Sequence, residues 1–64
     1  MARGMNIDDV IKEMIYEEGE SYKKAKRGAE NGNIADFHYW SGVAFACTQS
    51  LYYLKEIKKW LGRN

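Results

Sequence analysis

The sequence lacks proline, and its 64 residues hold one cysteine and one histidine. Without proline, the residue that breaks helix interiors, long helices are permitted throughout the chain. The lone Cys47 excludes a disulfide within the chain, and together with the lone His38 it falls short of the four ligands of a structural zinc site. A single thiol is typical of a reducing compartment. We therefore expect a cytoplasmic protein without a metal ion or cofactor.

An excess of charge of one sign and long apolar runs are also missing. Ten basic and nine acidic residues give a formal net charge of +1, too small for the long-range field that favours nucleic-acid binding. No apolar run reaches the roughly 20 residues that cross a bilayer, and the first six residues lack the apolar segment of a signal peptide. We expect no nucleic-acid or membrane partner. Residues 1–5 are predicted to form a flexible lead, with Met5 as an alternative native start.

The apolar residues follow a helical period in two segments. A first helix is predicted at about residues 7–30, beginning at Asn6 or Asp8, whose side chains can cap free backbone N–H groups. A turn is predicted at 31–33, because Gly32 or Asn31 can adopt the left-handed conformation that ends a helix. One continuous helix is the alternative, disfavoured by the cost of glycine in a helix interior, about 1 kcal/mol. The apolar positions of the first helix form one narrow stripe: Ile7, Val10, Ile11, Met14, Ile15, Tyr22, Ala25 and Ala29.

A second helix is predicted at about residues 34–61, ending at Gly62. The short turn makes the two helices antiparallel, and the acidic start of the first helix then lies beside the basic end of the second. The predicted fold is an all-α antiparallel hairpin, a single domain over residues 6–64. The apolar surface of the second helix covers more than half of its circumference. The part predicted to face the first helix contains Phe37, Trp40, Val43, Ala44, Cys47, Leu51, Leu54 and Leu61.

The remaining apolar residues of the second helix predict self-association. A core in so short a chain is marginal, and small domains without disulfides or metals are often stabilised by oligomerisation. We expect a homodimeric four-helix bundle, preferred to a trimer or tetramer for its simplicity. Phe45 and Tyr52 lie on an otherwise polar side and are the predicted contacts with a different protein. The predicted dimer interface contains Tyr39, Val43, Ala46, Ser50, Tyr53, Ile57 and Trp60.

Two features predict a possible ligand pocket. Glu18 falls within the apolar stripe of the first helix, where a carboxylate needs a polar neighbour such as Thr48, Ser41 or Tyr22. The alternative is that the stripe rotates slightly, so that Glu18 reaches solvent or bonds a tyrosine. A basic cluster before the turn and aromatic residues after it can together hold phosphates and stack a base. The residues of this hypothetical nucleotide pocket are Glu18, Tyr22, Lys26, Arg27, His38 and Trp40.

The sequence contains no nucleophile–base arrangement of the kind that enzymes use for covalent catalysis. It therefore predicts a non-enzymatic protein that works by binding. The first hypothesis is a small regulator or inhibitor of another protein, of a size that phages and mobile elements commonly encode. The alternative hypothesis is an oligomer that sequesters a nucleotide in a pocket between its subunits.

Overall fold

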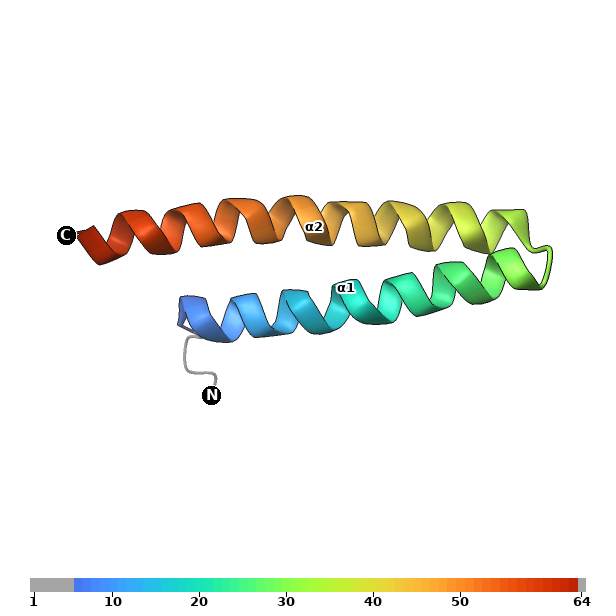
Figure 1. The fold of residues 1–64 in the computed structure, drawn as a ribbon, viewed down its shortest axis with the longest axis horizontal. Coiled ribbons are helices and arrows are strands. Elements are labelled where there is room, and N and C mark those ends of the chain that lie inside the picture. Colours follow the sequence, from blue (N-terminus) through green and yellow to red (C-terminus); the bar gives the residue numbers. More distant parts are fainter. Residues whose placement is uncertain (1–5, 64) are drawn as a thin grey trace, which may run out of the picture.

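The computed structural model describes residues 6–63; the predicted lead at residues 1–5 lies outside this range. Helix α1 spans Ile7–Glu30 and helix α2 spans Ile34–Arg63. The two helices lie side by side and antiparallel, and the C-terminal end of α2 runs on past the start of α1 (Figure 1). The predicted all-α hairpin is confirmed.

The turn is built by the residues that the sequence singles out. Gly32 has a positive φ of 72°, and its N–H donates to the Ala29 carbonyl at 3.2 Å. The Asn33 N–H donates to the Gly28 carbonyl at 2.8 Å, which completes the Schellman pattern of a helix end. Asn33 also starts α2, because its side-chain oxygen accepts the Asp36 N–H at 3.0 Å.

The outer ends of the helices follow the same local chemistry, with one difference. Asn6 caps α1 by accepting the Asp9 N–H at 2.9 Å. At the other end, α2 continues through Gly62 to Arg63 instead of ending at residue 61. Glycine permits the left-handed conformation without requiring it, and the φ of Gly62 is not positive.

The register of the hairpin brings the acidic start of α1 beside the basic end of α2, as the charge pattern predicts. Lys58 Nζ lies 2.6 Å from Asp8 Oδ1. Both side chains are largely exposed, so this ion pair contributes at most about 1 kcal/mol to stability. It marks the level at which α1 begins, and the last turn of α2 lies beyond it.

The core between the helices is narrow and made mostly of small residues. A Cβ added to Gly28 would lie 2.9 Å from the backbone nitrogen of Phe37, so glycine allows the two backbones to touch beside the turn. Larger residues, among them Met14 and Leu54, are half-buried towards the open end. The buried residues are Ser21, Ala25 and Gly28 of α1, with Ala44, Cys47 and Leu51 of α2.

The predicted apolar stripe of α1 is wrong at three positions. Ile15 and Tyr22 are 51% and 58% exposed, and Ala29 is exposed as well. The helix instead turns its small residues, such as Ser21, towards α2, because they permit a closer approach than a tyrosine does. On α2, two of the residues predicted to face α1, Phe37 and Leu61, are exposed. Leu61 lies beyond the level at which α1 begins.

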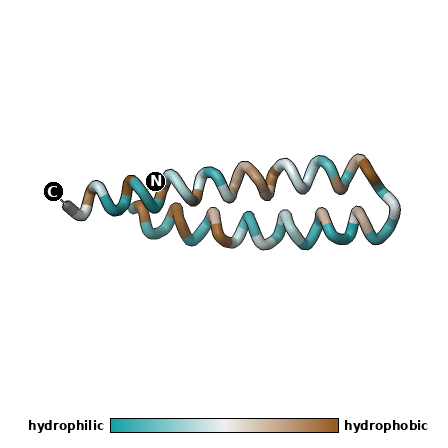
Figure 2. Tube along the Cα trace, turned by 45° about the horizontal axis from the view of Figure 1, so that its top comes forward, coloured by the Kyte–Doolittle hydropathy of each residue, from teal (hydrophilic) through white to brown (hydrophobic). Residues whose placement is uncertain are grey.

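Apolar residues recur between polar ones along α2, whereas the strongly apolar residues of α1 lie in its first half (Figure 2). Neither α1 nor α2, as far as the structure describes them, contains an apolar stretch that could cross a membrane. The hairpin leaves many large apolar side chains in contact with solvent: Ile15, Tyr16, Tyr22, Ile34, Phe37, Tyr39, Phe45, Tyr52, Tyr53, Ile57, Trp60 and Leu61. This exposed apolar surface is the most unusual property of the fold.

Candidate functional site

Glu18 and Thr48 meet across the two helices. The Thr48 hydroxyl donates a hydrogen bond to the Glu18 carboxylate and lies 3.0 Å from the carbonyl oxygen of Ala44. Glu18 is half-buried, whereas Thr48 is exposed. Of the three polar neighbours that the sequence suggests for Glu18, Thr48 is therefore the one that supplies a hydrogen bond.

Four large apolar side chains have the helical spacing of neighbours of this hydrogen bond. Ile15 and Tyr22 lie three residues before and four residues after Glu18, and Phe45 and Tyr52 have the same spacing about Thr48. Residues three or four apart are neighbours on a helix surface, so all four border the Glu18–Thr48 contact. We call these four residues and Glu18 the interhelical patch.

The interhelical patch is open to solvent. Its apolar side chains are between 51% and 65% exposed. Side chains of this size have roughly 150–250 Å² of surface, so the four together present roughly 400 Å² of apolar area. That area is comparable with the largest apolar patch of a typical monomeric protein, which is often functional.

A second apolar surface belongs to α2 alone. We call it the α2 stripe, and its large members are Tyr39, Tyr53, Ile57 and Trp60. The three aromatic side chains are between 61% and 64% exposed. Ala46 and Ser50 lie between them and are also exposed, whereas Val43 lies at the edge and is half-buried. The structure thus places the predicted interface residues along one surface that α1 leaves largely uncovered.

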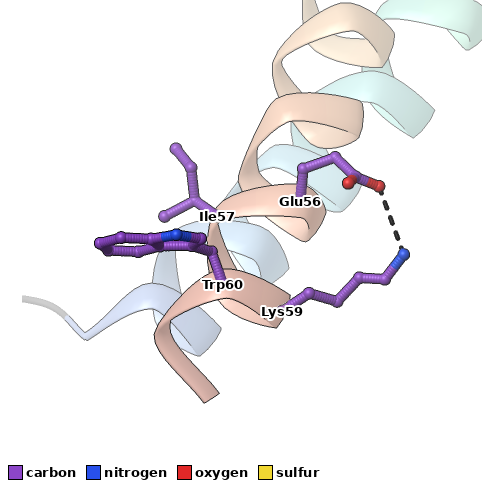
Figure 3. A pocket seen from close by; sticks show the side chains of 4 residues that line it. All are labelled: Glu56, Ile57, Lys59 and Trp60. Carbon is purple, nitrogen blue, oxygen red and sulfur yellow. Dashed lines mark hydrogen bonds and ion pairs between the residues drawn. The ribbon is translucent and has the colours of Figure 1, made fainter. Parts of the chain in front are cut away.

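The C-terminal end of the α2 stripe adjoins a shallow depression of about 360 Å³. Ile57 and Trp60 lie next to each other on one side of α2, and Glu56 and Lys59 project to the other side (Figure 3). Glu56 and Lys59 form an ion pair at 3.4 Å. The depression is lined by these four residues of α2, so it is a feature of an exposed helix surface.

Aromatic contacts hold several side chains of both surfaces in place. Tyr39 meets the ring of Trp40 edge-to-face, with ring centroids 4.8 Å apart, and Lys24 Nζ lies 4.3 Å from the centroid of the same indole. Tyr52 and Tyr53 make a similar contact at 5.3 Å. Because Tyr52 belongs to the interhelical patch and Tyr53 to the α2 stripe, this last contact joins the two surfaces.

Similarity to known proteins adds no information about these surfaces. No protein-family model, curated protein or solved structure matches the chain. The function therefore has to be inferred from the chemistry and the geometry of the hairpin itself.

The structure does not gather the six residues of the hypothetical nucleotide pocket. Arg27 and Trp40 line one depression of about 230 Å³ beside the turn. Glu18 and Tyr22 belong to the interhelical patch. His38 packs against the ring of Phe37 at 5.5 Å, and neither it nor the exposed Lys26 lines the depression.

The depression beside the turn is poorly suited to a nucleotide. Lys24, which the sequence-based pocket omitted, covers a face of the Trp40 ring on which a base would stack. Asp36 also lines the depression, and its carboxylate repels phosphate. Lys24 and Arg27 are three residues apart and share a helix face. This spacing is the sequence signal that places Lys24, and not Lys26, beside Arg27 in the depression.

Chemistry of other kinds has little support in the part of the chain that the structure describes. Residues 6–63 contain no group of three or more His, Cys, Asp and Glu side chains placed to hold a metal ion. Cys47 is a free, buried cysteine in the contact between the helices, where a thiol behaves as a small apolar residue. The two exposed apolar surfaces are therefore the strongest candidates for a functional site.

Proposed function

We propose that this chain is a small, non-catalytic protein-binding regulator that works as a homodimeric helical bundle. The proposal is carried by the large apolar side chains that one hairpin exposes on two adjoining surfaces, because soluble proteins seldom expose such surfaces without a binding role. The α2 stripe pairs with a second copy of the chain. The interhelical patch stays available and binds a different protein.

The composition of the interhelical patch supports the second role. Aromatic residues dominate the centres of protein interfaces and contribute most of their binding energy. Tyr22, Phe45 and Tyr52 supply such anchors, with Ile15 beside them. The four anchors stand on two adjacent helices, so a partner can be held from both sides.

Glu18 defines the chemistry of that partner. A protein segment that covers the patch removes water from the carboxylate. The single hydrogen bond from Thr48 does not neutralise its charge, and a desolvated carboxylate without a charged partner is costly. The fitting partner is an amphipathic helix with apolar residues at positions i and i+7 and a lysine or arginine between them. The apolar residues contact the anchors, and the basic residue pairs with Glu18.

The proposal is tested by comparing two double variants of the purified protein. The Phe45→Ala/Tyr52→Ala variant removes anchors of the patch, and the matched Tyr39→Ala/Tyr53→Ala variant removes the same kind of side chain from the α2 stripe. Each variant and the wild type are used to capture proteins from host lysate. We expect capture of a partner by the wild type and its loss in the Phe45/Tyr52 variant, with circular dichroism unchanged.

Charge reversal at the centre of the patch supplies the chemical test. Glu18→Lys is expected to abolish binding of the captured partner, and a basic-to-acidic change in the partner segment should restore it. Retention of the partner by the Phe45→Ala/Tyr52→Ala variant would place the binding site elsewhere. If that variant unfolds or becomes monomeric, these residues belong to the core or to the dimer interface, and the proposed role of the patch fails.

A further inference from the structure

The central part of the α2 stripe is symmetric about Ala46, both in spacing and in the size of its side chains. Gly42 and Ser50 lie four residues on either side of Ala46, and Tyr39 and Tyr53 lie seven residues on either side. The centre of the stripe therefore carries three small residues, with one tyrosine beyond them in each direction. A helix surface of this kind is able to match a reversed copy of itself.

A two-fold axis turns that symmetry into contacts. When a helix packs antiparallel on its own copy, the residue on the axis faces itself, and residues at equal distances before and after it face each other. With the axis at Ala46, Tyr39 faces Tyr53 of the second copy and Gly42 faces Ser50 of the second copy. The small central residues allow the two helices to approach closely, and an added Cβ at Gly42 would meet no atom within 4 Å in the single hairpin.

We infer that α2 packs antiparallel against α2 of a second copy across a two-fold axis at Ala46, an inference that rests on the proposed homodimer. Each tyrosine that would meet its counterpart makes an edge-to-face contact with its neighbour in the sequence, Tyr39 with Trp40 and Tyr53 with Tyr52. Ordering these side chains before association reduces the entropy lost on binding.

The outer parts of the stripe fit the same arrangement. Eleven residues from the axis, the small Ala35 of one copy faces the larger Ile57 of the other. His38 and Glu56 lie eighteen residues, or five helical turns, apart on one edge of the stripe. Antiparallel packing brings His38 of one copy near Glu56 of the other, whereas parallel packing brings each residue near the same residue of the second copy.

The area of the surface is sufficient for a stable dimer. The stripe contains no charged residue at its central positions, and its four large side chains are about half-exposed or more. Covering them and the small residues between them would remove roughly 500–800 Å² per copy from water, which reaches the standard size of a specific interface. A second copy is therefore the occupant whose pattern, chemistry and size agree with this surface.

Disulfide trapping tests the inference. In a Cys47→Ala background, Ala46→Cys is expected to form a disulfide-linked dimer at least tenfold faster than Lys23→Cys, a control on the exposed side of α1. Cross-linking requires Cα atoms about 4.4–6.8 Å apart, and for a residue and its own copy the axis provides this distance only near position 46. The Tyr39→Cys and Tyr53→Cys variants are expected to cross-link with each other when mixed and to cross-link slowly on their own.

Light scattering on each variant before oxidation measures whether it is a dimer. This measurement separates failure of the antiparallel arrangement from failure of the proposed homodimer. If the unmixed Tyr53→Cys variant cross-links as fast as Ala46→Cys, the two α2 helices are parallel. This result overturns the inference, while the proposed homodimer stands. A dimer in which no stripe position cross-links faster than the Lys23→Cys control uses another surface and also overturns the inference. A monomer in the Cys47→Ala background and in the wild type overturns the proposed homodimer itself.

Discussion

Gly28 is the residue at which the two helices are most sensitive to a single added atom. The Cβ of an alanine there would lie 2.9 Å from the Phe37 nitrogen and 3.1 Å from the Asp36 Cβ. Since backbone has to move to relieve such a contact, we expect Gly28→Ala to lower the free energy of unfolding by about 1–3 kcal/mol. Urea denaturation at one fixed protein concentration measures this change.

Gly19 supplies the matched control for that prediction. It also lies inside α1, but an added Cβ there would meet no atom within 4 Å. Gly19→Ala is therefore expected to raise the free energy of unfolding by about 0.5–1 kcal/mol, the ordinary gain of alanine over glycine in a helix. Equal stability of the two variants would contradict the close backbone contact at Gly28.

The pairing of Glu18 illustrates what sequence can predict about a single residue. Its position in the α1 stripe and the antiparallel register together place it near Thr48, and the structure contains that hydrogen bond. The exposure of Tyr22 and Ile15 beside it was not predicted. Their exposure depends on how far α1 rotates about its own axis, which the register along the helices leaves open.

At the scale of the elements, the turn depends on Gly32. Its φ of 72° lies in the left-handed region, which costs an L-amino acid about 1–2 kcal/mol. Gly32→Ala is expected to lower the free energy of unfolding by about that amount. The 64-residue chain is short enough for chemical synthesis, and D-alanine at position 32, which favours positive φ, is expected to preserve or raise stability. If the proteins with L-alanine and D-alanine at position 32 are equally stable, the left-handed conformation of that residue is wrong.

The helices themselves were predictable because their signals are local. Asn6, Gly32 and Asn33 act through hydrogen bonds to backbone groups within a few residues. Such caps can be predicted from the residues next to them in the sequence. Gly62 shows the limit of that approach, because the helix passes through it. A glycine marks a permitted helix end, and the surrounding hydrogen bonds decide whether the helix stops there.

At the scale of the whole molecule, the proposed homodimer makes stability depend on protein concentration. A folded dimer in equilibrium with unfolded chains gains about 1.4 kcal/mol for each tenfold rise in concentration. For two chains of this length the midpoint of thermal unfolding should rise by roughly 5 °C per tenfold increase. Circular dichroism melts over a series of concentrations measure it.

The Tyr39→Ala/Tyr53→Ala variant is the control for this concentration dependence. It truncates the two large tyrosines of the α2 stripe, so its melting midpoint should be lower than that of the wild type at every protein concentration. A wild-type midpoint that is independent of concentration would show that the hairpin is stable as a single chain. The exposed apolar surfaces would then need a different explanation.

The two helices, the turn between them and their antiparallel register follow from the sequence alone, since caps, glycine and charge order act over short distances or along the chain. The side of α1 that is buried depends instead on how the two helices pack. Apolar residues such as Tyr22 and small residues such as Ser21 occupy adjacent sides of that helix, and periodicity favours the apolar side. The close backbone contact at Gly28 favours the small side, and this steric fit between two helices leaves Ile15 and Tyr22 exposed around Glu18.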